Sequence, residues 1–290
     1  MAARKAAIVA ASGLTYTASV YVAFAYFNNN QESQLNKKKE ESGIETQSVF
    51  SYVKDPLRTQ TFQKIAYAYD DEIGKDEFVM GVGLLRRCLL YFHARGKVLE
   101  VGAGTGRNLS YYPNSSIVEK VIMTDTSNKM LDQAKEKIQS MAKDVRFETA
   151  VADAGNLKYP DNSFDTIIDT FGMCSFDDPL QVLLELQRVC RPGGKILLLE
   201  HGTTKKFKGL AGYLDKYAER HAKNWGCVWN RDIEKIVKDA GLKVEVIDTW
   251  HFGTTYYIVC KPGDNLDASF QLLKNRTKPL VATCSCGHRH

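Results

Sequence analysis

The sequence predicts an α/β fold, in which helices cover a mostly parallel β-sheet and an antiparallel hairpin closes that sheet. Three observations support this prediction. From about residue 61 onward, short β-branched runs alternate with helical stretches, as strand–helix–strand units do. A glycine-rich loop follows the first strand-like run. The last two runs, 244–250 and 255–260, are separated by four residues, which is too short a connection for parallel strands.

The other elements are predicted in chain order from the same alternation. Helices are expected at 128–142 and 179–190, and a short helix should follow the glycine-rich loop. The remaining strands are predicted at 96–101, 118–124, 144–150, 164–169 and 195–199. A sheet of this kind binds ligands at the carboxyl ends of its strands.

Length and composition limit the domain count and the class of protein. The chain has 290 residues, of which 44% are hydrophobic and 25% charged, so collagen-like and wholly disordered chains are excluded. The net charge of +5 includes no long basic block, and no nucleic-acid partner is expected. We divide the chain into a membrane anchor or targeting segment (1–30), a polar linker (31–50), one α/β domain (51–263) and a polar tail (264–290).

Residues 6–27 contain no charged side chain. As a helix they would extend about 33 Å, which is enough to span a bilayer. An uncleaved membrane anchor is the favoured interpretation, and a cleaved targeting peptide and a soluble helix are the alternatives. Lysine and arginine flank both sides of the segment, so its orientation stays open.

The cysteines indicate reduced thiols, because their number, seven, is odd and five of them are scattered singly. The exception is a group of four potential zinc or copper ligands in the tail, namely Cys284, Cys286, His288 and His290. A disordered polar tail is the favoured interpretation of that group, because no second ligand pair lies nearby in the sequence.

The glycine-rich loop contains Gly102, Gly104 and Gly106, an arrangement that lets backbone approach a ligand. Dinucleotides and S-adenosylmethionine are the two ligand classes to consider. The dinucleotide fingerprint G-x-G-x-x-G requires a third glycine. That position is Arg107 or Leu109 in the two available frames, so the fingerprint fails in both.

Acidic residues near three successive strand ends favour S-adenosylmethionine. Glu100 would repel a pyrophosphate but attract the ammonium or sulfonium of that cofactor. Asp125 stands where a carboxylate accepts the ribose hydroxyls, and Asp153 where one accepts the adenine amine. The expected cofactor-binding residues are Glu100, Gly102, Gly104, Gly106, Asp125, Thr126, Asp153, Ala154 and Thr170.

These motifs, together with the Arg-Pro-Gly-Gly run at 191–194, resemble those of class I S-adenosylmethionine-dependent methyltransferases. The resemblance covers about 67–262 and implies a seven-stranded Rossmann-like sheet whose last strand is antiparallel. Four further runs are similar to the membrane-anchored methyltransferase-like proteins of the fungal mitochondrial inner membrane: 104–108, 170–175, 199–202 and 221–227. Ubiquinone, menaquinone, thiol and phospholipid methyltransferases are more distant relatives. This narrower resemblance implies a single-pass protein of the mitochondrial inner membrane, with another intracellular membrane as the alternative, and it identifies no substrate.

Methyl transfer requires a general base only when the acceptor must lose a proton. Candidates past the fourth and fifth strands are Cys174, Asp177, Glu200 and His201. His201 is the best candidate, because an imidazole accepts a proton near neutral pH. A structural role for this histidine is the alternative, and no metal ion is expected in the site.

An aromatic stripe is predicted on one helix within 205–232, because its members recur every fourth residue: Tyr213, Tyr217, His221, Trp225 and Trp229. Two interpretations stand equally. The stripe forms a wall for an apolar substrate or a face against lipid, or it packs against the sheet.

The leading hypothesis is a membrane-tethered methyltransferase that acts on a small apolar or lipid-like acceptor. No Asn-Pro-Pro-Tyr or Asp-Pro-Pro-Tyr run follows the fourth strand, which argues against amino methylation of adenine or glutamine. The alternatives are a non-catalytic assembly factor that keeps the cofactor pocket, an enzyme acting on protein or RNA, and, more remotely, a nicotinamide dehydrogenase.

Overall fold

The computed structural model describes residues 56–141 and 146–264. They belong to one compact unit that spans 52–290. The predicted anchor at 6–27, the linker at 31–50 and the tail ligands at 284–290 lie outside the described residues. Among the helices that are described, none combines the length and the apolar character needed to cross a membrane.

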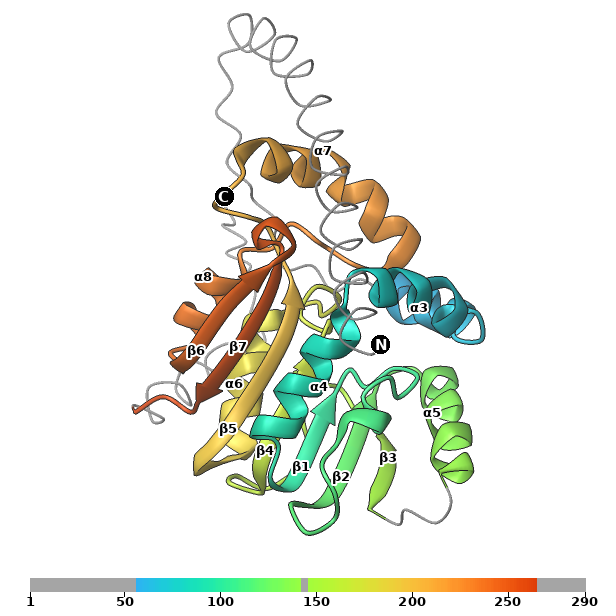
Figure 1. The fold of residues 1–290 in the computed structure, drawn as a ribbon, viewed down its shortest axis with the longest axis vertical. Helices are drawn as coiled ribbons and strands as arrows, with labels where there is room; N and C mark the ends of the chain where they lie inside the picture. Colours follow the sequence, from blue (N-terminus) through green and yellow to red (C-terminus); the bar gives the residue numbers. More distant parts are fainter. Residues whose placement is uncertain (1–55, 142–145, 265–290) are drawn as a thin grey trace, which may run out of the picture. The chain divides into compact units, whose positions relative to one another are not determined.

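A seven-stranded sheet forms the centre of the described unit (Figure 1). Its strand order is β3-β2-β1-β4-β5-β7-β6. Strand β7 runs antiparallel to both of its neighbours, and the other pairings are parallel. The predicted hairpin is therefore confirmed. The strands are β1 (Gly96–Val101), β2 (Val118–Asp125), β3 (Phe147–Val151), β4 (Phe164–Thr170), β5 (Cys190–His201), β6 (Lys243–Trp250) and β7 (Thr255–Lys261).

Helices cover both faces of this sheet. The described helices are α2 (Pro56–Ile65), α3 (Tyr69–Val79), α4 (Val82–His93), α5 (Asn128–Ser140), α6 (Pro179–Val189), α7 (Lys208–Trp225) and α8 (Ile233–Asp239), with short 3₁₀ turns η1 (Leu109–Tyr111) and η2 (His251–Gly253). On β1, Val98 packs with the hydrophobic cluster of α4 and α5, whereas Leu99 packs with that of α6 and α8. This alternation gives the strand two apolar faces and buries it between helices.

Three predicted elements differ from those observed. The third strand begins at Phe147 rather than 144. Strand β5 begins at Cys190, directly after α6, because Cys190 pairs with Phe164 before an irregularity restores regular pairing at Lys195. The short helix expected after the glycine-rich loop is present only as the three-residue 3₁₀ helix η1, to which turns lead.

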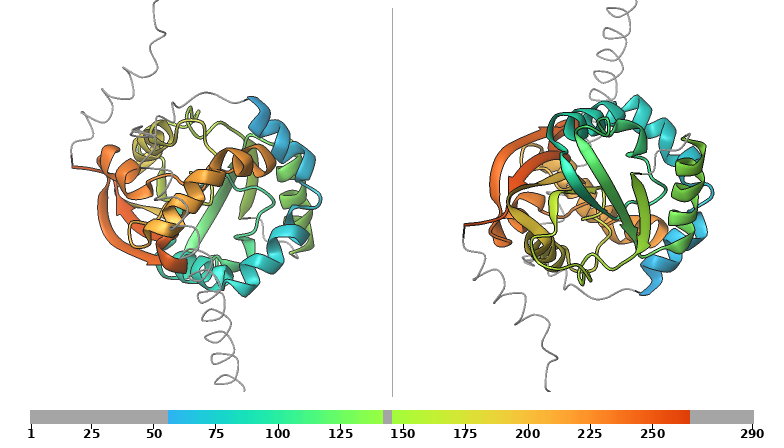
Figure 2. Two further views of the ribbon diagram at one scale, coloured as in Figure 1. Left: turned by 90° about the horizontal axis from the view of Figure 1, so that it is seen from above. Right: turned by 90° about the horizontal axis from the view of Figure 1, so that it is seen from below.

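Helix starts agree better with the sequence, because side chains cap them. The Ser127 side chain accepts a hydrogen bond from Met130 N–H and begins α5, and Asp178 does the same for Gln181 N–H at the start of α6. Helix α7 follows β5 and lies across the carboxyl ends of the strands, with α2 and α3 beside it (Figure 2). This edge of the sheet carries the candidate site.

Candidate functional site

A cavity of about 510 Å³ opens at the carboxyl ends of the central parallel strands. Its wall takes residues from the ends of four strands, β1 to β4, and from α2 and α3. All nine residues predicted to bind the cofactor are accounted for: eight line the cavity, and Gly106 lies in the loop beside it. The expected clustering of strand ends is thus present in the structure.

The glycine-rich loop reaches this cavity with its backbone. Gly102, Gly104 and Gly106 all have positive φ angles, between 54° and 77°, which side chains disfavour. A Cβ atom on Gly104 would meet only the Gly102 carbonyl oxygen, 4.0 Å away, so this position is open for a ligand. A Cβ on Gly106 would lie 2.8 Å from the Leu109 side chain. The absence of a side chain at Gly106 therefore makes room for Leu109, whereas at Gly104 it lets a ligand approach the backbone closely.

Glu100 lies near the end of the central strand β1, and it is 1% exposed. Asn108 Nδ2 donates to its Oε1 at 2.9 Å, and the Tyr112 hydroxyl donates to its Oε2 at 2.6 Å. Burial raises its pKa to about 7, although both hydrogen bonds oppose the shift. A cation bound in the cavity would therefore favour the ionised form of this carboxyl group.

Asp125 fixes the turn that follows β2. Its Oδ2 accepts a hydrogen bond from Gly104 N–H at 2.9 Å, and its Oδ1 accepts one from Ser127 N–H at 2.8 Å. Burial raises the pKa of Asp125, and these N–H donors counteract the rise. The exposed Thr126 follows it on the cavity wall. The carboxylate therefore connects two ligand-facing loops.

Asp153 and Ala154 follow β3 on the same wall. Asp153 is exposed, and its Oδ1 accepts a hydrogen bond from Gly155 N–H at 2.8 Å. Because the Asp153 side chain is exposed on the cavity wall, its carboxylate is accessible to a ligand amine. Ala154 is buried and presents a flat apolar contact instead.

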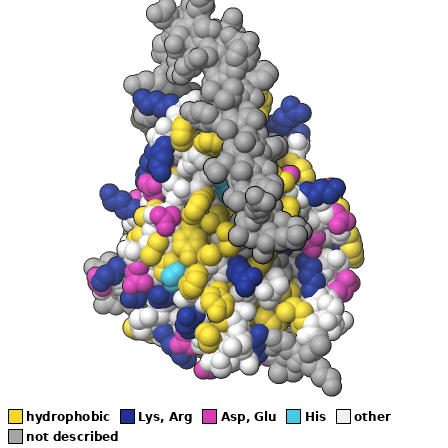
Figure 3. Space-filling model, viewed as in Figure 1, with side chains coloured by type: hydrophobic (Ala, Val, Ile, Leu, Met, Phe, Trp, Pro, Cys, Tyr) yellow, Lys and Arg dark blue, Asp and Glu magenta, His cyan; other side chains and the backbone are white. Residues whose placement is uncertain are grey.

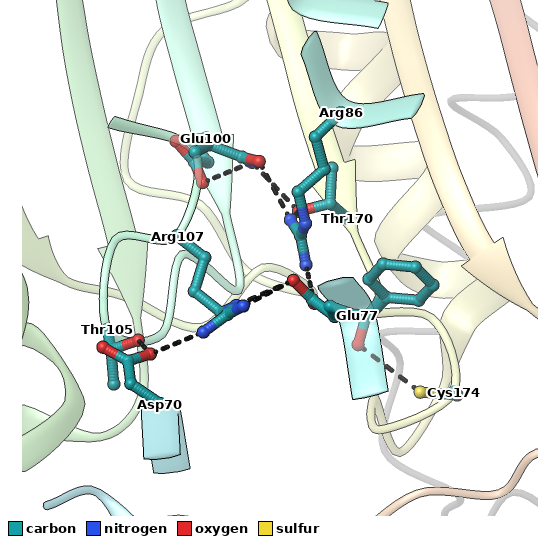
Figure 4. A network of polar contacts seen from close by, with 10 residues as sticks. Asp70, Glu77, Arg86, Glu100, Thr105, Arg107, Thr170 and Cys174 are labelled. Atoms are coloured by element: carbon teal, nitrogen blue, oxygen red, sulfur yellow. Dashed lines mark hydrogen bonds and ion pairs between the residues drawn. The ribbon is translucent and has the colours of Figure 1, made fainter. Parts of the chain in front are cut away.

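Thr170 at the end of β4 leads into a polar network that the sequence did not indicate (Figure 4). Its Oγ1 accepts from Arg86 Nη1 at 2.7 Å and from Asn108 Nδ2 at 3.0 Å. Arg86 Nη2 pairs with Glu77 Oε1 at 2.8 Å, and Arg107 Nη2 pairs with Glu77 Oε2 at 2.6 Å. Glu77 on α3 therefore connects α4 to the loop after β1.

Asp70 extends the network at the start of α3. Its Oδ1 accepts from the Thr105 hydroxyl at 2.7 Å and pairs with Arg107 Nη1 at 3.1 Å, and its Oδ2 pairs with Lys137 of α5. A sequence signal existed for one member of the network. Arg86 occupies a helix position that the neighbouring Val82, Leu85 and Leu89 mark as buried. An arginine in such a position requires a partner.

The predicted base His201 does not line the cavity. Its ring centroid lies 4.3 Å from that of Phe171, whose side chain belongs to the cavity wall. Cys174 also lies behind this wall and is 2% exposed. Asp177 is the candidate base that does line the cavity. The catalytic assignment of His201 therefore stays a prediction and would require Phe171 to move.

Glu200 is fully buried beside Asp169. Burial raises the pKa of both carboxyl groups. The Asp169 charge raises the pKa of Glu200 further, whereas a hydrogen bond from Glu200 opposes the rise at Asp169. The Gly172 backbone N–H and the Glu200 side chain are the hydrogen-bonding groups beside Asp169. The pair is satisfied when Glu200 is protonated and donates to Asp169, so Glu200 serves structure here.

The aromatic stripe is arranged differently from the prediction. Helix α7 ends at Trp225, where Gly226 adopts a left-handed conformation, so Trp229 is not on the helix. The chain turns back, and the Trp229 ring stacks on His221 at 3.8 Å while its Nε1 donates to the Leu214 carbonyl at 2.9 Å. Tyr213 remains 47% exposed. Part of the stripe therefore packs against α7 and the loop that follows it, and is not available to a substrate or to lipid.

Comparisons with known proteins agree with this geometry. A family model described as a methyltransferase domain matches residues 99–198. The chain is 35% identical over 162 residues to a phosphatidylethanolamine N-methyltransferase of Cereibacter sphaeroides, covering 55% of this chain and 76% of that protein. The chain belongs to the class I S-adenosylmethionine-dependent methyltransferases. Its cofactor is accordingly S-adenosylmethionine.

Two further relatives extend the comparison. The mitochondrial methyltransferase OMS1 of Saccharomyces cerevisiae is 34% identical over 218 residues, which is 70% of this chain and 46% of that protein. This chain therefore matches less than half the length of the yeast relative. A ubiquinone/menaquinone biosynthesis C-methyltransferase of Cronobacter sakazakii is 30% identical over 201 residues, covering 67% of this chain and 76% of that protein.

The cavity fits the cofactor of this family. The open space at Gly104 lets a ligand contact the protein backbone, and Asp125 lines the same cavity. No α-helix begins at the glycine-rich loop, so the helix N-terminus that pyrophosphate sites use is missing here among the described residues. A cationic ligand with a free ribose suits this site better than a dinucleotide.

Proposed function

We propose that this methyltransferase holds S-adenosylmethionine with the ends of β1 to β4 and transfers its methyl group to a small apolar or lipid-like acceptor. The observation that carries the proposal is the convergence of Glu100, Asp125 and Asp153 on one cavity. Glu100 would face the charged methionine part of the cofactor, Asp125 its ribose and Asp153 its adenine. When bound, the cofactor supplies the activated methyl group, and the protein aligns it and excludes water.

Replacing Asp125 with alanine tests the ribose assignment. Two hydroxyl hydrogen bonds to a carboxylate contribute about 1.5–3 kcal/mol each, so we expect the variant to lose S-adenosylmethionine affinity by at least about 100-fold, measured by calorimetry. Asp125→Asn keeps one acceptor oxygen and should lose less. Asp132→Ala on the exposed side of α5 removes the same charge away from the cavity and should bind normally. Unchanged affinity in Asp125→Ala would refute the assignment.

The acceptor class is supported by the surface around the site. Large apolar side chains are exposed on both sides of the turn between α3 and α4: Phe78 at the end of α3 is 86% exposed and Val79 62%, and Leu84 at the start of α4 is 66% exposed. His251 Nε2 lies 2.8 Å from the Met80 carbonyl oxygen and joins this turn to the β6–β7 turn. Both turns lie at the carboxyl edge of the sheet, as the cavity does.

Hydrophobic side chains also gather on the neighbouring face between α4 and the β6–β7 pair (Figure 3). Exposed members of this face are Tyr91 on α4 and Val246 and Trp250 on β6. Exposed apolar area of this kind marks interaction with a membrane or a partner. Together with the uncharged segment at 6–27, it supports a domain held against a bilayer. The yeast relative is mitochondrial, and we propose that this chain is a single-pass protein of the mitochondrial inner membrane.

The apolar turn predicts binding to lipid independently of the anchor. For a chain that begins at Tyr52, the double variant Phe78→Ser, Val79→Ser should float at least about 10-fold less with phosphatidylcholine–cardiolipin vesicles, because each side chain contributes about 1.5–3 kcal/mol of burial. Val151→Ser changes an exposed valine on β3 and is the matched control. Equal flotation of the double variant and the control would contradict the role of this turn.

Metabolite analysis can identify the methyl acceptor. Untargeted measurement of lipids and quinones after loss of the gene should show an unmethylated precursor accumulating. The wild-type chain should restore the product, whereas Asp125→Ala should not. Full rescue by Asp125→Ala would favour the alternative of a non-catalytic assembly factor.

A further inference from the structure

Three potential metal ligands meet behind the cofactor cavity. Cys174 comes from the loop after β4, His201 from the end of β5, and Cys227 from the connection between α7 and α8. One ligand atom from each residue, either a thiol sulfur or an imidazole nitrogen, lies within 4.8 Å of the other two. The sequence separations are 27 and 26 residues, so the fold rather than a local motif brings them together.

The cofactor cavity does not account for this cluster. Phe171 and Ser175 form the wall at this point, and none of the three ligands lines it. The Cys174 sulfur lies 3.4 Å from the Phe171 carbonyl oxygen and 3.5 Å from the Ser175 hydroxyl. The cluster is thus one residue layer away from the cavity and has no part in holding the nucleotide.

We propose that Cys174, His201 and Cys227 bind one Zn²⁺ ion. Two cysteines and one histidine form a known ligand set for zinc, with a fourth position left for water or another small ligand. In a tetrahedral site, Zn–S bonds of about 2.3 Å and a Zn–N bond of about 2.0 Å place the ligand atoms about 3.5–3.8 Å apart. Since the ligand atoms lie within 4.8 Å of one another, each pair has to close by about 1.3 Å or less to reach this spacing, which rotamer adjustment provides.

The surroundings of the cluster favour a cation. The fully buried Asp169 carboxylate lies close enough to interact electrostatically with Cys174, and Arg231, which acts on Cys227, is the opposing positive charge.

A bound ion would have two consequences. It would tie the loop after β4 and the end of β5 to the segment that carries α7, which lies over the strand ends (Figure 2). It would also occupy an imidazole nitrogen of His201. Because that lone pair then cannot accept a proton, zinc binding and general-base catalysis by His201 exclude each other.

The test measures zinc in the full chain, purified in detergent and loaded with Zn²⁺ alone. The four tail residues Cys284, Cys286, His288 and His290 are first replaced by serine and asparagine, so that they contribute no ligands. Elemental analysis after dialysis should give about one zinc per chain. Removing a primary ligand should weaken zinc binding by more than about 100-fold, because loss of a mere outer partner costs 10–100-fold. Cys174→Ala and Cys227→Ala should therefore retain less than a tenth of the metal.

Matched controls separate this site from general damage. Cys88→Ala on α4 removes a partly exposed thiol outside the cluster and should retain the full metal content. Cys227→Ala should still bind S-adenosylmethionine, so failure of the zinc site and failure of the proposed cofactor site give different results. Co²⁺ substitution should produce a thiolate charge-transfer band in the parent and not in Cys227→Ala, while far-ultraviolet circular dichroism confirms that the variant folds.

Three results would overturn the proposal. The first is a parent chain that holds no zinc after loading. The second is equal zinc content in the parent, Cys174→Ala and Cys227→Ala. The third is a Cys174–Cys227 disulfide found by mass spectrometry in protein kept under reducing conditions, because a disulfide consumes both sulfur ligands.

Discussion

Replacing Glu77 with alanine is expected to lower the free energy of unfolding by about 3–5 kcal/mol, because removing one partner of a buried ion pair leaves the other charge uncompensated. The charge left behind is Arg86, which is 3% exposed and would keep only the neutral acceptors Asn108 and Thr170. Chemical denaturation at neutral pH measures the change. Arg107 would also lose two hydrogen bonds at 2.6 and 3.0 Å.

The same substitution should weaken cofactor binding, because Glu77 holds the loop after β1 against α3. Asp76→Ala, one residue earlier on the exposed side of α3, is the matched control and should change stability by no more than about 0.5 kcal/mol. The Glu77 carboxyl has a lowered pKa, which burial opposes and Arg86 and Arg107 bring about. Its contribution is therefore present at neutral pH and lost on acidification. A loss below 1 kcal/mol in Glu77→Ala would contradict the importance of this pair.

The strand ends were predictable because their signals are local. Asp125 ends a β-branched run, and the carboxyl ends of parallel strands meet at one edge, so its place in the site follows from topology. Arg86 was marked only as an arginine at a buried helix position, without a partner, and Glu77 gave no signal. Both precede β1 on helices whose packing brings them under the glycine-rich loop, and no spacing rule connects them to it.

The differences from prediction at α7 and after the glycine-rich loop share one cause. Periodicity predicts which residues share a face but not where a helix stops. Gly226 ends α7 in a left-handed conformation, and so Trp229 reaches the stripe by turning back. After Gly106 the chain makes successive turns that bring Asn108 onto Glu100, and this hydrogen bond competes with a regular helix. Tertiary contacts decided both outcomes.

Glu100 should make the stability of the apoprotein depend on pH. Its pKa is 4.5 in an unfolded chain and about 7 in the fold, chiefly because of burial. A raised folded pKa stabilises the protein below the unfolded value, and that contribution is lost as the pH rises through 7. The loss amounts to about 3 kcal/mol between pH 4.5 and 8, at 1.36 kcal/mol for each pKa unit. Glu100→Gln keeps the shape and removes the titration.

The measurement is the difference in unfolding free energy between Glu100→Gln and the wild-type chain at each pH. Other buried carboxyl groups, such as Asp169 and Glu200, titrate in both proteins and cancel in this difference. The variant should gain about 3 kcal/mol relative to wild type as the pH rises from 4.5 to 8. A difference that stays constant with pH would show that Glu100 ionises as it does in water.

Cofactor binding should reverse this cost. The sulfonium and ammonium groups of the bound cofactor favour the ionised form of Glu100. The ionised carboxylate, which destabilises the apoprotein, is therefore stabilised in the complex. For each protein, the S-adenosylmethionine affinity at pH 8 is divided by the affinity at pH 6. This ratio should be up to about 10-fold larger for wild type than for Glu100→Gln. The amino group of the cofactor titrates equally with both proteins. Calorimetry at pH 6 should also detect release of a proton on binding to wild type, and its absence would place the cationic part of the cofactor away from Glu100.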